Sequence, residues 1–288
     1  MSSAELGVRF IVCESTTLMG DVAKMTINEA NRKVVLVTGA AKRLGRAIAI
    51  AMAKSGWDVA IQFANSKDAA EQTVKDILAT GQRGVALQAD LSDESQAAQL
   101  IKRCTEAMGL PTCLINNASL FQYDVASSFS YSSLDRHMKT NVAAPLILSR
   151  DFYRQHLKAR AKDAHGPSGV VINLLDQKLA NLNPDFLSYT LSKSALHSAT
   201  TLLAQSFAPV LRVVGVAPGI TMVSGDQTED GFQKAHGMTP LGKSSTPEDI
   251  AGAVMYLATA SAVTGTTLYV DGGQHLLPTD RDVMFLTE

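Results

Sequence analysis

Three side chains with complementary acid–base chemistry follow one another in the segment INLLDQKLANLNPDFLSYTLSK, residues 172–193: Asp176, Tyr189 and Lys193. Tyr189 and Lys193 are four residues apart, so on a helix they share one face and can meet one ligand. A free tyrosine has a pKa of about 10, which a neighbouring ammonium lowers by favouring the phenolate. The spacing indicates a general acid, Tyr189, assisted by Lys193. A YxxxK pair alone is also typical of an ordinary helix surface. Its position, after a fifth strand and behind a dinucleotide-type turn, favours the catalytic interpretation.

A glycine turn between a strand and a helix is indicated by TGAAKRLGRAIAIAMA, residues 38–53. Such a turn lets the backbone approach a pyrophosphate, whose charge the free amides at the helix start stabilise. Only Gly39 and Gly45 are present, which is not the usual GxGxxG spacing. The pattern predicts a dinucleotide site, but alone it fits an ordinary strand–helix turn.

The end of the second strand indicates which dinucleotide binds. An acid about 20 residues after the turn normally binds the ribose, but the segment QFANSK, residues 62–67, contains none. This favours the extra phosphate of NADP(H), with Lys42, Arg43, Asn65, Ser66 and Lys67 as donors or positive charges. Solvated loop residues are the alternative interpretation, above all for Lys67.

Short β-branched runs alternate with amphipathic segments after Lys33, which predicts a parallel sheet covered by helices. Strands are expected at 34–38, 59–63, 84–88, 113–116, 169–174, 212–216 and 267–270. Helices are expected at 44–55, 67–80, 93–108, 131–160, 186–208 and 247–258. The fold class is therefore α/β in a single domain, residues 33–288, preceded by an N-terminal extension, residues 1–32, expected to be loosely ordered.

Composition excludes several function classes. The 288 residues include 26 basic and 27 acidic side chains, so no global charge attracts nucleic acid or an anionic membrane. Three cysteines without a CxxC pair, and six histidines without ligand spacing, indicate neither a disulfide framework nor a metal site. We expect a soluble cytoplasmic protein, because no signal peptide or membrane span is apparent.

Beyond these patterns, the chain resembles the short-chain dehydrogenase/reductase family over nearly all of residues 33–275. The matching landmarks are TGAAKRLG (38–45), AD (89–90), NNAS (116–119), Asn141 in TNVAAP, YTLSK (189–193), APG (217–219) and VDGG (270–273). The resemblance implies a Rossmann-like, doubly wound sheet of seven parallel strands, usually in a homotetramer, and hydride transfer from a nicotinamide.

The resemblance also implies residue roles. Tyr189 would be the proton donor, Lys193 would hold the nicotinamide ribose and lower the tyrosine pKa, and Asn141 would hold a water of the proton relay. The implied cofactor-binding residues are Gly39, Lys42, Arg43, Leu44, Gly45, Asn65, Ser66, Asp90, Leu91, Asn117, Ala118, Ser119, Tyr189, Lys193, Pro218 and Gly219.

Two departures from the family pattern are informative. Arg43 stands where the family usually has glycine or alanine, and Asp176 where it usually has serine. Together with Phe121, which follows NNAS, they look like the pteridine reductases and related bacterial dihydropteridine reductases. That resemblance implies that Arg43, Ser119, Phe121, Asp176 and Tyr189 bind substrate, with the phenylalanine stacked on the pterin. Phe121 as a core residue is the alternative.

Asp176 is the residue that bears most on the substrate. A carboxylate can accept hydrogen bonds from the amino and ring N–H groups of a pterin or, when protonated, relay a proton with Tyr189. Burial would raise its pKa whereas Lys193 would lower it, so both protonation states stay open. The alternative is an aspartate that only caps the turn after the fifth strand.

Two further segments belong to the expected substrate site. Residues 221–245 are glycine-rich and polar, and we expect a mobile lid there. The tail, residues 274–288, is longer than the sheet requires and is expected to reach a neighbouring subunit's site, with Arg281 as a candidate contact.

The sequence thus predicts an NADPH-dependent reductase that takes a dihydropterin or dihydrofolate-like substrate to its tetrahydro form. A carbonyl reductase of the same family, for example of 3-oxoacyl thioesters, is the first alternative. A catalytically silent NADP-binding regulator is the second, and the intact Tyr189, Lys193 and Asn141 argue against it.

Overall fold

The computed structural model describes residues 32–163, 168–223 and 228–287. Residues 1–31, and with them nearly all of the expected N-terminal extension, lie outside this range. From Lys33 onward the chain folds as one compact unit.

Seven parallel strands form one sheet in the order β3-β2-β1-β4-β5-β6-β7, which confirms the doubly wound α/β fold. Their buried β-branched and aliphatic residues explain the near-continuous apolar runs of the sequence. The strands are β1 (Val34–Val37), β2 (Asp58–Phe63), β3 (Gly84–Gln88), β4 (Cys113–Asn116), β5 (Gly169–Leu174), β6 (Leu211–Pro218) and β7 (Thr267–Val270).

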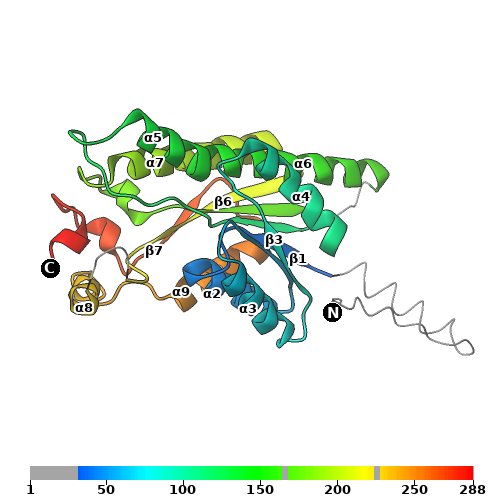
Figure 1. Ribbon diagram of the computed structural model, residues 1–288, viewed down its shortest axis with the longest axis horizontal. Helices are drawn as coiled ribbons and strands as arrows, with labels where there is room; N and C mark the ends of the chain where they lie inside the picture. The colour runs from blue at the N-terminus through cyan, green and yellow to red at the C-terminus, as the bar shows by residue number, and fades with distance from the viewer. Residues whose placement is uncertain (1–31, 164–167, 224–227, 288) are drawn as a thin grey trace, which may run out of the picture. The chain divides into compact units, whose positions relative to one another are not determined.

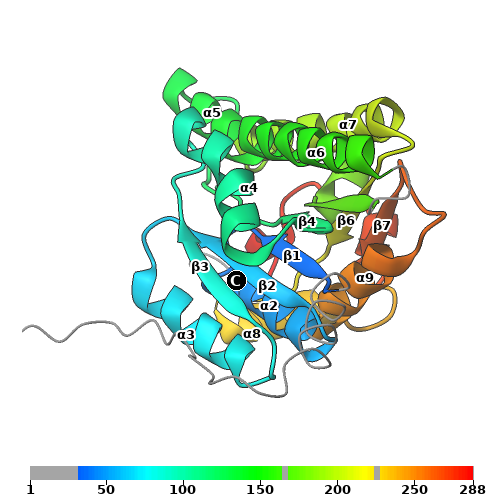
Figure 2. The same cartoon turned by 90° about the vertical axis from the view of Figure 1, so that its right-hand side faces the viewer.

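Helices cover both faces of the sheet (Figures 1 and 2). One layer contains α2 (Arg43–Lys54), α3 (Lys67–Leu78) and α9 (Pro247–Thr259). The opposite layer contains α4 (Glu94–Met108), α6 (Ala144–Lys162) and α7 (Leu187–Phe207), with α5 (Tyr131–Met138) against α7. Each layer buries its own apolar cluster against the sheet, so the strand ends are held rigidly from both sides.

The helix expected over residues 131–160 is interrupted. A π-helical turn, Lys139–Ala143, separates α5 from α6. Pro145 has no N–H to bond the carbonyl of Asn141, which favours the wider turn. A short helix, α8 (Glu229–Gly237), lies within the segment expected to be a lid, where glycine content obscured its N-cap, Thr228.

The carboxyl ends of the strands form the edge at which a ligand is expected. β1 pairs with β2 on one side and β4 on the other, so the chain reverses its direction across the sheet at this point. The crevice outside such a reversal is the usual ligand site of open α/β sheets.

Candidate active site

A cavity of about 540 Å³ opens at this edge of the sheet. Its wall contains ten of the predicted site residues: Arg43, Leu44, Asn117, Ser119, Phe121, Asp176, Tyr189, Lys193, Pro218 and Gly219. They come from the start of α2, the segments that follow β4 and β5, the end of β6, and α7. Residues spread over most of the chain therefore meet around one space.

The backbone of the β1–α2 turn packs unusually close to the segment that follows β4. Gly39 has a φ of +62°, and a Cβ there would lie 2.8 Å from Cα of Ala118. At Gly45 a Cβ would lie 2.4 Å from the Gly39 carbonyl oxygen and 2.5 Å from Nδ2 of Asn117. Only glycine fits either place without displacement of backbone. The two glycines thus have a packing role that any larger residue would disrupt.

Two side-chain amides, the buried Gln62 and the half-buried Asn117, brace this turn. Gln62 accepts a hydrogen bond from the Gly39 N–H at 2.8 Å and donates to the Ala89 carbonyl at 2.7 Å. From the other side, Nδ2 of Asn117 donates to the Thr38 carbonyl at 2.8 Å. The first residue of the acid-free segment therefore fixes the turn, so it is not available to a ribose.

Arg43 has a left-handed backbone, with a φ of +54°. Glycine adopts this conformation at no steric cost, which gives a physical reason for the family's usual small residue here. The guanidinium extends across the cavity wall and donates to the Val223 carbonyl at 2.7 Å. Arg43 therefore links the dinucleotide turn to the segment after β6.

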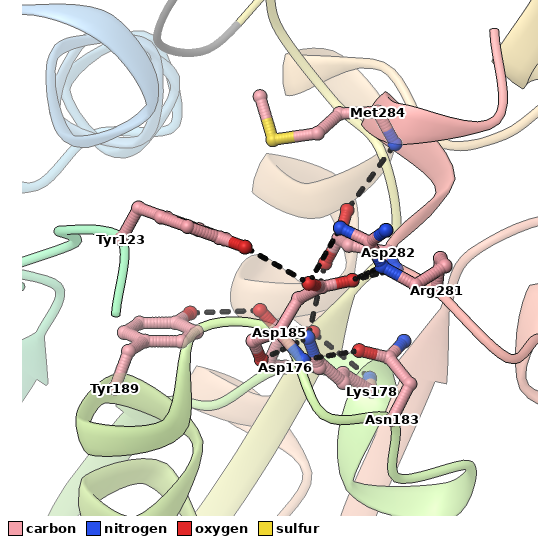
Figure 3. Close-up of polar contacts among 9 residues, drawn as sticks. All are labelled: Tyr123, Asp176, Lys178, Asn183, Asp185, Tyr189, Arg281, Asp282 and Met284. Atoms are coloured by element: carbon pink, nitrogen blue, oxygen red, sulfur yellow. Dashed lines mark hydrogen bonds and ion pairs between the residues drawn. The ribbon is translucent and has the colours of Figure 1, made fainter. Parts of the chain in front are cut away.

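The Tyr189 hydroxyl donates a 2.7 Å hydrogen bond to Oδ2 of Asp176 (Figure 3). Oδ1 of the same carboxyl accepts from the Lys178 backbone N–H at 2.8 Å. One oxygen therefore caps the turn after β5 and the other faces the tyrosine, so the capping contact leaves Oδ2 free to act beside Tyr189, and a role toward substrate stays a prediction. Burial raises the pKa of Asp176, as does the nearby Asp282 charge, and the hydrogen bonds offset this only in part.

The expected lowering of the Tyr189 pKa by Lys193 is wrong. Burial, and next the adjacent Asp176 charge, raise the pKa of Tyr189 well above its usual value. The Lys193 ammonium lies 5.7 Å from the centre of the tyrosine ring and donates instead to the Leu174 carbonyl at 2.7 Å. Tyr189 therefore stays protonated at neutral pH, in the form that can donate.

Lys193 is a buried cation with few protein partners. Its side chain is 3% exposed, and burial lowers its pKa to about 8. Its one hydrogen bond within the described residues goes to Leu174, although an ammonium has three donors. The remaining donors suit a ligand with hydroxyl groups in the adjoining cavity.

Asn141 supports the site from behind. Its Oδ1 accepts from the Leu120 N–H at 2.7 Å, and its Nδ2 donates to the Leu120 carbonyl and to Oγ of Ser192. The amide thus fixes the backbone between Ser119 and Phe121. The water-holding role implied by the resemblance stays a prediction.

Phe121 belongs to the cavity wall, since 40% of its surface is exposed. Its ring stacks on Phe186 at 4.3 Å between centroids and meets Tyr189 edge-on at 4.7 Å. The alternative interpretation as a core residue is therefore wrong. A planar ligand that reaches Tyr189 would pass this aromatic surface.

The remaining predicted residues lie outside the wall of this cavity: Lys42, Gly39, Gly45, Asn65, Ser66, Asp90, Leu91, Ala118 and Asn141. The Thr38 hydroxyl accepts from the Ala118 N–H at 3.0 Å, and Oδ1 of Asp90 accepts from Ser92. Lys42 and Asn65 are exposed, and Ser66 is half-buried at the start of α3. No metal-binding cluster and no membrane-spanning helix occur in the part of the chain that the structure describes.

Sequence reasoning missed Phe186 and Lys178. Phe186, the N-cap of α7, has a left-handed φ of +55° and is buried against the ring of Phe121. Lys178 is buried, and its ammonium lies 5.4 Å from the centre of the Phe186 ring. The short loop NPDF offered a turn signal but no periodicity that would reveal these contacts.

The expected reach of the C-terminal tail to a neighbouring subunit's site stays a prediction. Within its own chain the tail folds back onto the cavity, and Asp282, Val283 and Met284 line it. The cause is a set of ionic contacts with the loop before α7, centred on Asp185 (Figure 3). Arg281 and its partner Asp185 are 96 residues apart in sequence, so no local sequence pattern predicts that they pair.

Comparisons with known proteins identify a family and several relatives. The family described as enoyl-(acyl carrier protein) reductase matches residues 39–275. A Brucella suis structure titled FolM alternative dihydrofolate reductase 1 in complex with NADP is 37% identical, covers 87% of this chain and 97% of its own, and has a TM-score of 0.80. An uncharacterised oxidoreductase of Methylorubrum extorquens is 34% identical over 84% of this chain and 97% of its own. A 3-oxoacyl-[acyl-carrier-protein] reductase of Staphylococcus epidermidis is 30% identical over 85% and 99%. The chain belongs to the short-chain dehydrogenase/reductase family of oxidoreductases.

Proposed function

We propose that this protein is an NADPH-dependent pterin reductase, acting on a dihydropterin or dihydrofolate-like substrate. The observation that carries the proposal is the Tyr189–Asp176 hydrogen bond beside the exposed ring of Phe121. A serine hydroxyl in place of Asp176 would suit a ketone oxygen, whereas a carboxyl suits a heterocycle with amino and ring N–H groups. The likeness to the Brucella alternative dihydrofolate reductases supports the same substrate class.

NADP(H) fits the residues of the nucleotide end. The two glycines of the β1–α2 turn pack too closely against Ala118 and Asn117 to carry a side chain, and Lys193 has donors that bond no other described residue. Arg43 and Lys42 supply positive charge, while no acid follows Gln62 in the turn after β2. When bound, the cofactor supplies a hydride to the substrate.

The protein's own residues would manage the proton. Reduction of a ring C=N bond adds hydride to carbon and a proton to nitrogen. Tyr189, protonated at neutral pH, donates that proton, and Asp176 either restores it or, as a carboxylate, orients the ring through its amino groups. Phe121 and Ser119 hold the ring from the β4 side.

Reduction of a 3-oxoacyl thioester is the second candidate, favoured by the Staphylococcus relative. The same Tyr189 could protonate an alkoxide. However, a buried carboxyl beside it would then face an oxyanion of like charge, which is unfavourable unless Asp176 is protonated. A catalytically silent NADP-binding regulator would not need a tyrosine hydroxyl hydrogen-bonded to a buried carboxyl.

One assay separates these candidates. NADPH oxidation by the purified protein is followed with dihydrobiopterin, dihydromonapterin, dihydrofolate and acetoacetyl-CoA in parallel. We expect turnover of at least one of the three pterin-containing substrates. Turnover of the thioester alone would overturn the proposal, and binding of NADPH without turnover of any substrate would favour the regulator.

We also propose, from the family resemblance, a cytoplasmic homotetramer. The two described cysteines, Cys104 and Cys113, are free and buried, which is compatible with a reducing compartment. Light scattering of the purified protein would give the oligomeric state directly.

A further inference from the structure

The tail residues Arg281–Phe285 return to the same cavity that holds Asp176 and Tyr189. Asp282, Val283 and Met284 contribute to its wall. Farther on, Thr287 is only 5% exposed and its hydroxyl donates to the Val283 carbonyl, so the segment is packed beyond the cavity as well. An unanchored chain end would not be held in this way.

Asp185 is the centre of the contacts that hold this segment. Its two carboxylate oxygens accept from Nε and Nη2 of Arg281 at 2.8 and 2.9 Å, a bidentate pair. Oδ2 also accepts from the Asp282 N–H at 2.7 Å, and Oδ1 from the Tyr123 hydroxyl at 3.3 Å. Burial alone would raise the pKa of Asp185, but these donors outweigh it and lower the pKa, so the carboxylate is charged at neutral pH.

A second ionic contact fixes the next residue. The buried Lys178 ammonium donates to the Asp185 carbonyl at 2.7 Å and to Oδ2 of Asp282 at 3.1 Å. Lys178 is also the residue whose backbone N–H donates to the capping carboxyl of Asp176, two positions before it. We call Asp185, Arg281, Asp282 and Lys178 the tail anchor. The anchor thus connects the tail directly to the turn that positions Asp176.

Aromatic contacts continue the same connection. Phe285 lies 5.3 Å from Tyr123 and 6.1 Å from Phe186 between ring centroids, and the Arg281 guanidinium lies 5.0 Å from the Phe285 ring. Phe186 in turn stacks on Phe121, the ring that faces the cavity. Movement of the tail would therefore disturb both the ionic and the aromatic support of the substrate side.

We propose that residues Asp282–Met284 form a specificity-determining wall of the substrate pocket in their own chain, and that Asp185 is the positioning residue that holds this wall. The wall sets the affinity for substrate, while the cofactor end, built by the β1–α2 turn, is independent of it. The choice of substrate in this inference rests on the proposed function. The tail anchor does not depend on the proposed function.

Two variants test the anchor from opposite sides. Asp185→Asn removes the buried charge, and Arg281→Gln removes its half-exposed partner, which leaves folding less affected. We expect KM for dihydrobiopterin to rise roughly tenfold in each, with kcat and the Kd of NADPH little changed. Arg281→Lys, which keeps the charge, should recover part of the affinity. Glu106→Gln, which breaks the exposed Lys102–Glu106 pair, is the matched control.

Hydrogen exchange provides a readout that needs no turnover. Amides of residues 282–287 should exchange faster in Asp185→Asn and Arg281→Gln than in the wild type or in Glu106→Gln. If turnover is found only with acetoacetyl-CoA, the proposed function fails and KM is measured with that substrate instead. Unchanged exchange would overturn the anchor. An unchanged KM despite faster exchange, or a parallel loss of NADPH binding, would overturn the specificity wall.

Discussion

The two ends of the cavity are constructed differently. At the nucleotide end, two closely packed glycines shape the backbone turn beside the cavity, and the amides of Gln62 and Asn117 hold that turn. At the substrate end, long side chains form the surface, and charged pairs hold them, with Asp185 and Arg281 far apart in sequence. A site shaped by the backbone suits the cofactor, which many enzymes share. A site shaped by side chains can change from one relative to another without loss of the fold.

The largest effect that tests this division is expected from Tyr189→Phe. The aromatic packing against Phe121 stays, but the proton donor is removed, so kcat should fall about 10³-fold. The Kd of NADPH, measured by fluorescence titration, should stay within the error of the wild type. A comparable loss of NADPH binding would show that the two ends are not independent.

Asp176→Ser should have the next largest effect. The variant restores the family's usual residue and can still accept from the Lys178 N–H, so the turn keeps its cap. We expect pterin kcat/KM to fall about 100-fold with little change in NADPH binding. An equal loss of pterin kcat/KM and of NADPH affinity would identify Asp176 as a purely structural residue.

Gly45→Ala tests the nucleotide end. The added Cβ would overlap the Gly39 carbonyl oxygen and the Asn117 amide, and overpacking of this kind costs about 1–3 kcal/mol. We expect weaker NADPH binding and a lower free energy of unfolding, measured by titration and by urea denaturation. Gly252→Ala, in α9, is the control, because its Cβ would meet no atom within 4 Å. Equal behaviour of the two variants would contradict the close-approach role.

The smallest effect expected is a dependence on pH. Burial lowers the pKa of Lys193 to about 8, so the ammonium is present below that pH and is lost as pH rises through it. Because the charged form can hold a cofactor hydroxyl, kcat/KM and NADPH affinity should both decline above pH 8. A flat profile from about pH 7 to 9 would show that the charge is not required.

Much of the fold could be predicted because its signals are local. Each of the seven strands is a short buried run bounded by turns, and the expected positions agree within two residues at every end. The α5–α6 break was missed because its cause, Pro145, is also a common first-turn residue of a helix. The start of α9, by contrast, agrees with the helix expected from residue 247, and the structure contains a full capping box of Thr246 with Asp249.

The candidate site could be predicted only in part. Motifs located Tyr189, Lys193 and Asp176 at one cavity, because each follows a strand that ends at the same edge. Their electrostatics could not be predicted, since the raised pKa of Tyr189 depends on burial and on the direction of its hydrogen bond. The tail anchor could not be predicted either, because ion pairing over 96 residues depends on the completed fold.

The two-ended hydrogen bonding of Gln62 has a consequence for redesign of coenzyme preference. Exchange of this residue for an acid is an obvious way to convert the protein to NAD. A carboxylate could still accept from Gly39, but it could not donate to the Ala89 carbonyl, which would lose its partner. Engineers should therefore leave Gln62 unchanged and vary the exposed positions that follow it, Ala64 and Asn65.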